Sequence, residues 1–279
     1  MFRTRLISGI LLVIAALAVI FTGGVYLAAV LCLISIIAYR ELTKACGLRF
    51  TKGKFSALEI TGIIMTVLYY LLLILSLRWG LTKVYPAVMI AVVVTFLIFL
   101  FVYVFAFPRY QANQVMAAMF SFLYAPVMLS FIYLLRQGFA QGRYLVWFVF
   151  LSSWGSDTCA YAVGVLIGKH KMTPKLSPKK SVEGAVGGVV GAALLFVLYT
   201  HLVIHVYTDV ALPLSLAALL GAVGAMVSMV GDLAASAVKR DHNIKDYGKL
   251  IPGHGGIMDR FDSVIVTAPI IFIGIMMLV

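Results

Sequence analysis

SAVKRDHNIKDYGKLIPGHGGIMDRFD, residues 236–262, is a highly charged stretch between two apolar runs of a 279-residue chain that is 63% hydrophobic. It holds four of the ten acidic residues and five of the 22 lysines and arginines. Asp232 precedes it by one helical turn. Ionisable groups inside or beside membrane-spanning segments are costly and are usually kept for function. We therefore expect the functional site here. The alternative is a solvated loop whose charges only set topology, but acidic residues add little to topology.

One helix over residues 211–240 would place several polar side chains on a single face, because residues at i, i+4 and i+7 are neighbours on a helix. The predicted face carries Ser228, Asp232, Ser236 and either Lys239 or Arg240.

The turn at residues 252–256, Pro-Gly-His-Gly-Gly, can direct consecutive backbone N–H groups at one phosphate. Asp259 and Asp262, three residues apart, would share a face of the helix that follows. Carboxylates on two helices, with basic residues around them, suit Mg²⁺ carrying a polyphosphate.

A second informative stretch, residues 156–184, reads SDTCAYAVGVLIGKHKMTPKLSPKKSVEG. Asp157 is the only acidic residue within its apolar run, and Tyr161 and Gly164 follow on the same face. Beyond the helix, five lysines crowd a short loop. Such a loop can bind the phosphates of a lipid headgroup or a nucleotide. Positive-inside anchoring explains part of the pattern equally well.

These two stretches resemble the phosphatidate cytidylyltransferase (CDP-diacylglycerol synthase) family. The likeness covers residues 150–279, through a Ser-Asp-x-x-Ala-Tyr helix, the loop SPKKSVEG at 177–184, and the pattern of residues 236–262. It implies transfer of the cytidylyl group from CTP to phosphatidic acid, with release of pyrophosphate. No Ser-His-Asp or Cys-His pairing in the sequence indicates a covalent intermediate, so we expect direct displacement. The resemblance also implies two cation sites, one that binds Mg²⁺ and a second that binds Mg²⁺ or another metal ion. A homodimer would also fit the family.

The resemblance, together with the residue types, predicts the following roles. Metal ligands are Asp157, Asp232, Asp259 and Asp262; catalytic groups are Asp232, Lys239, Arg240, His254, Asp259 and Arg260; substrate-binding groups are Tyr161, Lys179, Lys180, Ser181, Ser228, Ser236, Lys245, Asp246, Gly255 and Gly256.

The whole chain has the composition of an all-α integral membrane protein, with 11% charged residues and a mean hydropathy of +1.08. Nine apolar runs are long enough to span a bilayer, at roughly 17–25 residues each. They lie near 5–22, 25–39, 57–77, 85–107, 113–135, 144–168, 185–207, 211–238 and 261–279.

Basic residues predict the orientation of these spans. With the N-terminus in the cytoplasm and the C-terminus outside, 18 of the 22 lysines and arginines face the cytoplasm. The loops at 169–184 and 239–260 then face the cytoplasm, which favours a site on the inner face of the cell's inner (plasma) membrane. The net charge of +12 indicates contact with anionic lipid and nucleotide. No pattern typical of nucleic-acid binding is present.

We expect residues 1–140 to be scaffold helices without buried charge, with Arg40 and Glu41 as surface anchors, and residues 141–279 to be the catalytic region. Two other functions stay open. A CTP-dependent kinase of polyprenol or phytol type would transfer the γ-phosphoryl group instead. An ion-coupled transporter would use Asp157 and Asp232 as an intramembrane relay.

Overall fold

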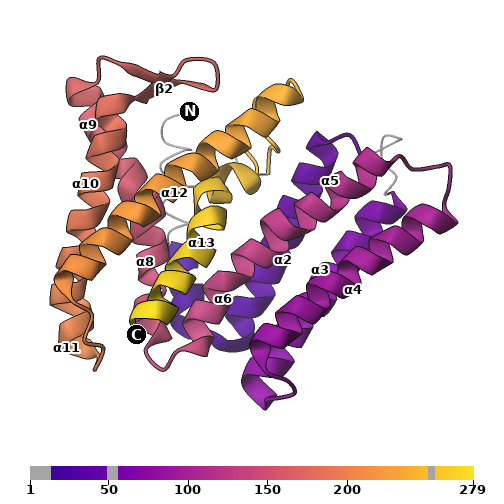
Figure 1. Ribbon diagram of the computed structural model, residues 1–279, viewed down its shortest axis with the longest axis horizontal. Coiled ribbons are helices and arrows are strands. Elements are labelled where there is room, and N and C mark those ends of the chain that lie inside the picture. Colours follow the sequence, from indigo (N-terminus) through magenta and orange to yellow (C-terminus); the bar gives the residue numbers. More distant parts are fainter. Residues whose placement is uncertain (1–13, 49–55, 251–254) are drawn as a thin grey trace. The chain divides into compact units, whose positions relative to one another are not determined.

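The computed structural model describes residues 14–48, 56–250 and 255–279 of the chain, and most of them are helical (Figure 1). After a helical segment at 14–22, the first half forms α2 (Gly24–Ala45), α3 (Ala57–Trp79), α4 (Val84–Phe105), α5 (Ala112–Phe122), the π-helical turn η1 (Leu123–Val127) and α6 (Met128–Gly138). The second half forms α7 (Gly142–Leu145), α8 (Trp147–Phe150), the π-helical turn η2 (Leu151–Gly155), α9 (Ser156–Ile167), α10 (Val182–Tyr199), the π-helical turn η3 (Thr200–Ile204), α11 (His205–Tyr207), α12 (Leu214–Asp241) and α13 (Met258–Leu278).

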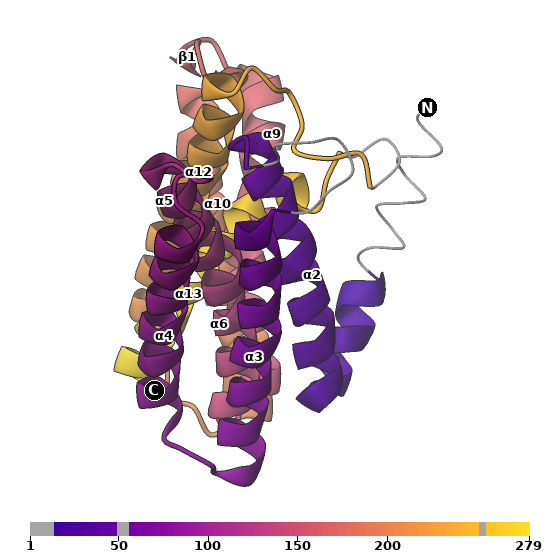
Figure 2. The same cartoon turned by 90° about the vertical axis from the view of Figure 1, so that its right-hand side faces the viewer.

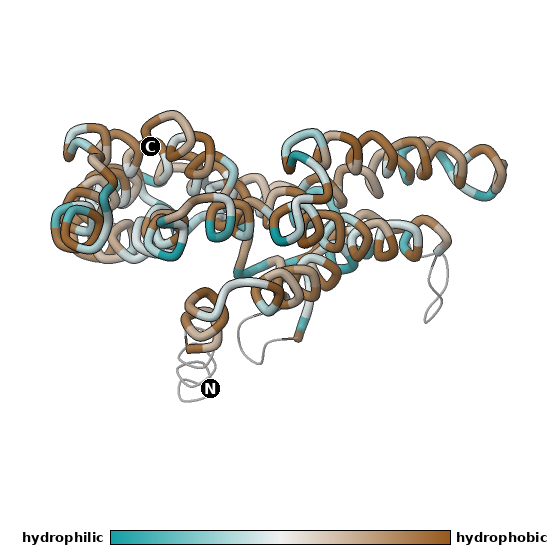
Figure 3. The backbone as a smooth tube through the Cα atoms, turned by 90° about the horizontal axis from the view of Figure 1, so that it is seen from below, coloured by the Kyte–Doolittle hydropathy of each residue, from teal (hydrophilic) through white to brown (hydrophobic). Residues whose placement is uncertain are grey.

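Seven helical segments among the described residues are long and apolar enough to cross a membrane. Figure 3 shows hydrophobic positions, in brown, along much of the helical backbone. The prediction of an all-α, multi-pass membrane protein is confirmed. Its count of nine spans stays a prediction, because the run at 5–22 is described only from residue 14 and the run at 144–168 is divided among α7, α8, η2 and α9.

The chain divides into two compact units. Unit 1 comprises Met1–Tyr133 and Ile244–Arg260, and unit 2 comprises Leu134–Asn243 and Phe261–Val279. Residues 244–250 and 255–260, which carry much of the charged stretch, therefore belong to the same unit as the N-terminal helices. The first turn of α13 belongs to unit 1 and the rest of that helix belongs to unit 2.

In unit 1, α3 packs between α2 and α4 (Figure 2). The α3 helix begins where the Ser56 hydroxyl accepts the Glu59 N–H at 3.1 Å, an N-cap that satisfies a backbone donor with no partner inside the helix. The Glu59 side chain is fully buried, and Oε1 lies 3.4 Å from Nε of Arg40 on α2. The expectation that the first half lacks buried charge is therefore wrong. This acid is retained inside the unit because a basic partner stands beside it.

In unit 2, α10 packs against both α9 and α12. Glycines permit this contact: a Cβ on Gly188 of α10 would lie 3.0 Å from the Cβ of Ala160 on α9. The lysine-rich segment between α9 and α10 forms a small antiparallel hairpin of β1 (Lys171–Thr173) and β2 (Ser177–Ser181), at one end of the helix pair (Figure 1). The sequence predicted only a loop at this position.

Candidate active site

The centre of the candidate site in unit 2 is an ion pair between Lys180 and Asp232. Nζ of Lys180, on β2, lies 2.6 Å from Oδ2 of Asp232, on α12. The Nζ atom is buried, so Asp232 neutralises a cation that solvent does not reach. The ion pair joins the lysine loop to the helix face that the sequence marked as polar.

Two further carboxylates interact with this pair. Asp157, in the first turn of α9, experiences the charges of both Asp232 and Lys180, and the Ser263 side chain on α13 lies close enough to stabilise its charged form. Asp262, buried on α13, experiences the charges of Asp232, Asp157 and Lys239. Three of the four predicted metal ligands are thus electrostatic neighbours within unit 2.

A pocket of about 570 Å³ opens over the ion pair. Carboxylates, lysines and small residues line it, and on one side it meets the exposed face of α9. Its lining residues are Asp157, Ala160, Tyr161, Gly164, Val165, Lys171, Met172, Lys179, Lys180, Ser181, Gly184, Ala185, Met229 and Asp232. The predicted binding residues Tyr161, Lys179, Lys180 and Ser181 therefore share one pocket with Asp157 and Asp232. The Ser181 hydroxyl oxygen also caps α10 by accepting the Gly184 N–H at 3.1 Å.

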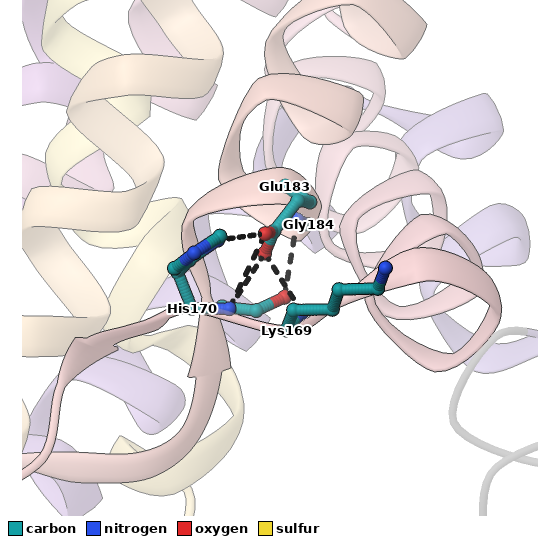
Figure 4. Close-up of polar contacts among 5 residues, drawn as sticks. Lys169, His170, Glu183 and Gly184 are labelled. Atoms are coloured by element: carbon teal, nitrogen blue, oxygen red, sulfur yellow. Dashed lines mark hydrogen bonds and ion pairs between the residues drawn. The ribbon is translucent and has the colours of Figure 1, made fainter.

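Glu183 stabilises the base of the hairpin that carries Lys180 through hydrogen bonds and an ion pair. The Glu183 carboxylate accepts the backbone N–H of Lys169 at 3.1 Å and that of His170 at 3.2 Å, and it pairs with the His170 ring (Figure 4). These contacts close the loop between the end of α9 and the start of α10. Glu183 thereby limits where the β2 lysines can lie, a role that the sequence interpretation did not assign.

The polar face predicted for α12 exists, although its members differ in burial. Ser228 and Ser236 are buried, Lys239 is 9% exposed, and Arg240 is exposed at the helix end. The Ser228 hydroxyl, one turn before Asp232, has no hydrogen-bond partner among the described residues. A buried hydroxyl without a partner is uncommon in folded proteins and marks a polar position that a ligand can satisfy.

In unit 1, Asp259 accepts backbone hydrogen bonds from two parts of the charged loop. Its Oδ2 accepts the N–H of Tyr247 at 2.9 Å and that of Gly256 at 3.0 Å. Gly255 has φ 85°, and a Cβ there would stand 2.9 Å from the same oxygen. The Gly256 amide, which the sequence assigned to a substrate phosphate, thus already has an intramolecular acceptor.

Glu41, at the end of α2, contacts the same loop. Its carboxylate accepts the N–H of Ile257 at 3.2 Å and that of Met258 at 2.8 Å. The interpretation of Glu41 as a surface anchor is therefore wrong. The only sequence signal was an acid at the end of an apolar helix, and local periodicity does not reveal a partner more than 200 residues away.

The remaining predicted site residues belong to unit 1 or fall outside the description. Lys245, Asp246 and Arg260 are exposed in unit 1, and His254 lies outside the described residues.

A divalent cation such as Mg²⁺ takes hard oxygen ligands, which carboxylates supply. Within residues 14–48, 56–250 and 255–279, no three His, Cys, Asp or Glu side chains form a ready metal-binding group. Mg²⁺ does not require such a group, because it is commonly held by one or two carboxylates together with substrate phosphates. The hard oxygens of Asp157, Asp232 and Asp262 fit that mode of binding, and the Ser228 hydroxyl lies one helical turn from Asp232 on α12.

Fold and site together define an all-α membrane protein with a pocket of carboxylates and lysines. Residues 3–278 match the model of the cytidylyltransferase family. The chain is 31% identical over 269 residues to a phosphatidate cytidylyltransferase of Staphylococcus saprophyticus, covering 96% of this chain and 97% of that protein. A Staphylococcus aureus protein of the same name is 29% identical, with the same coverage. One from Synechocystis is 52% identical over 61 residues, which is 22% of this chain and 21% of that protein.

The chain therefore belongs to the cytidylyltransferase family, a family of nucleotidyltransferase enzymes. The resemblance drawn from residues 150–279 is confirmed, and it extends over the N-terminal half as well, where the sequence had indicated only apolar helices.

Proposed function

We propose that the protein transfers the cytidylyl group of CTP to phosphatidic acid, forming CDP-diacylglycerol and pyrophosphate for phospholipid biosynthesis. Family membership and the names of its relatives support this class of reaction. The observation that carries the proposal is the pocket in which Lys180 and Asp232 pair at 2.6 Å, next to an apolar helix face.

That helix face suits a lipid substrate. On α9, Tyr161 is 74% exposed, Val165 67% and Leu166 80%. In a membrane-spanning protein, exposed apolar side chains contact acyl chains, and tyrosines favour the depth of the headgroups. A phosphatidate molecule could enter from the side, with its phosphate at the lysines and its chains along α9.

The chemistry requires two polyanions to meet. The phosphate monoester of phosphatidate has a second pKa near 6, so it is largely a dianion at neutral pH and needs no strong general base. One of its oxygens attacks the α-phosphorus of CTP, and a new P–O bond forms. The bond from the α-phosphorus to the oxygen that bridges it to the β-phosphorus breaks, and pyrophosphate leaves with that electron pair. The ammonium groups of Lys179 and Lys180 offset the negative charge of the lipid phosphate.

Mg²⁺ at this pocket would be held by Asp157, Asp232 and Asp262. Asp259, which belongs to the other unit, stays a predicted metal ligand. We include a second cation in the proposal. A divalent ion there would supply charge neutralisation for the attacking and leaving oxygens. The basic loops support a site that faces the cytoplasm at the plasma membrane. The proposal also includes that two copies of this chain form a homodimer.

Labelled CTP tests the reaction. Purified protein in detergent micelles with phosphatidate and Mg²⁺ should move label from [α-³²P]CTP into chloroform-soluble lipid, and label from [γ-³²P]CTP into pyrophosphate. EDTA should stop both. Label from the γ-position in lipid would identify a lipid kinase, and no transfer in either arm would overturn the proposal.

A further inference from the structure

Glu41 lies where α2 ends and contacts the N-terminal turn of α13. Its Oε1 accepts the Ile257 N–H at 3.2 Å, and its Oε2 accepts the Met258 N–H at 2.8 Å. The first N–H groups of a helix have no acceptor inside the helix, and the positive end of the helix dipole favours an anion there. The carboxylate therefore fixes the start of α13 to the end of α2.

Two glycines provide the space for this carboxylate. A Cβ on Gly248 would overlap Oε1 of Glu41, and a Cβ on Gly256 would overlap both carboxylate oxygens. A Cβ on Gly248 would also stand 3.1 Å from the Cα of Gly256, so the two glycines and the acid form one close-packed group. Glycine is required at both positions because the Glu41 side chain occupies the space that any other side chain would need.

Asp259 holds the same loop through different amides, those of Tyr247 and Gly256. Among the described residues, two carboxylates from opposite ends of the chain thus accept the backbone N–H groups of Tyr247, Gly256, Ile257 and Met258. In the sequence this loop lies between Lys245, predicted to bind substrate, and Arg260, predicted to be catalytic.

We propose that Glu41 is a positioning residue: it sets the conformation of residues 255–258 against Gly248 and thereby the placement of Asp259 for the reaction. Its effect on catalysis rests on the proposed function, whereas its effect on the loop does not. Glu41 accepts backbone N–H groups of the loop, so it acts on Asp259 through the backbone.

Hydrogen exchange tests the structural half of the proposal without any substrate. In Glu41→Gln, an amide NH₂ replaces one acceptor and faces a backbone N–H, so the peptide covering residues 255–258 should exchange about tenfold faster or more. Tyr69→Phe is the matched control, because it removes a buried hydrogen bond to Ser130 in the same unit. It should leave exchange at 255–258 unchanged. Equal exchange in wild type and Glu41→Gln would overturn the proposal.

A double-mutant cycle with Gly248 tests the catalytic half. Glu41→Ala and Gly248→Ala should each lower kcat by about 10- to 100-fold, with a much smaller change in the KM for CTP, because the loop is misplaced and not removed. The double variant Glu41→Ala/Gly248→Ala should be no worse than the poorer single variant, because the new methyl group enters the space that the carboxylate left.

Glu41→Gln is the size-matched control in this cycle. It keeps the volume of the side chain, so it should give no relief to Gly248→Ala. Additive losses in both cycles, or equal relief by Ala and Gln, would overturn the positioning role. If wild-type protein forms no CDP-diacylglycerol, the proposed function fails, and the exchange experiment still decides whether Glu41 holds the loop.

Discussion

Nζ of Lys180 lies 2.6 Å from Oδ2 of Asp232, which links a surface hairpin to a membrane-spanning helix. The two residues come from segments that the sequence marked separately, one as a lysine-rich loop and the other as a polar helix face. Because the Lys180 ammonium is buried, the removal of either partner leaves an uncompensated charge in the pocket.

Replacement of the two partners should therefore have distinct kinetic effects. Asp232→Asn should lower kcat by about 100-fold or more, because the proposed metal site loses a charged oxygen ligand. Lys180→Ala should mainly raise the KM for phosphatidate, by about tenfold, because a cation beside the lipid phosphate is lost. Steady-state rates at varied mole fraction of phosphatidate in mixed micelles measure both effects.

Lys175 provides the control for Lys180. It is exposed in the turn between β1 and β2 and does not line the pocket. Lys175→Ala should leave the KM for phosphatidate within about twofold of wild type, since isolated surface charges contribute little. A comparable rise in both variants would mean that the lysines act only through the net charge of the loop.

Replacing Asp259 by asparagine removes the charge of the side chain but keeps an oxygen that can accept hydrogen bonds. Among the described residues, the N–H groups of Tyr247 and Gly256 donate to the same oxygen, Oδ2, and the carbonyl oxygen of an asparagine can take that position. Asp259→Asn should therefore keep the loop and the thermal unfolding temperature close to wild type. It should nevertheless lower turnover by about 100-fold or more, because a metal ligand loses its charge.

Asp241, exposed at the end of α12, is the matched control, and Asp241→Asn should retain near-normal activity. Normal turnover in Asp259→Asn, with loss only in Asp259→Ala, would remove Asp259 from the metal site. It would then remain a residue that holds the loop.

The helices could be predicted from sequence because a bilayer leaves the backbone few choices. Polar backbone groups in lipid must be satisfied within the segment, so a long apolar run implies a helix. The run predicted at 211–238 corresponds to α12 at Leu214–Asp241, and the run at 57–77 to α3 at Ala57–Trp79. The spacing of Ser228 and Asp232 likewise predicted a polar face that the structure contains.

The long-range contacts of the site could not be predicted in this way. The Glu41 carboxylate accepts the N–H of Met258, 217 residues further along the chain, and no local sequence pattern in either helix predicts this contact. The β1–β2 hairpin was missed because lysine and proline are poor strand formers, and its pairing depends on packing beside α10. Sequence identified which carboxylates are present, but not that one oxygen of Asp259 is already engaged by the loop.

Tyr161 tests whether the lipid approaches along α9. Its ring is 74% exposed and lines the pocket, so Tyr161→Ala should raise the KM for phosphatidate about threefold to tenfold while leaving the KM for CTP unchanged. Tyr207, 63% exposed on α11 and away from the pocket lining, is the control, and Tyr207→Ala should change neither constant. A rise in the KM for CTP alone would place the nucleotide, not the lipid, against α9.

Glu183 should act on the lipid substrate through Lys180. Oε2 of Glu183 accepts the N–H groups of both Lys169 and His170, and Oε1 also accepts the His170 N–H. In Glu183→Gln the NH₂ group therefore faces the His170 N–H whichever position it takes, and the base of the hairpin loosens. The KM for phosphatidate should rise about threefold to tenfold, with kcat nearly unchanged, because the β2 lysines lose their fixed position.

The double variant Glu183→Gln/Lys180→Ala separates this positioning role from general damage. If Glu183 works only by holding Lys180 beside Asp232, its loss costs nothing further once the lysine is gone, and the double variant should match Lys180→Ala in the KM for phosphatidate. Multiplied effects would contradict this, since they would mean that Glu183 influences the pocket by another route. Lys175→Ala, combined with Glu183→Gln, should leave the Glu183→Gln value as it is, because Lys175 lies in the hairpin turn and not in the pocket lining.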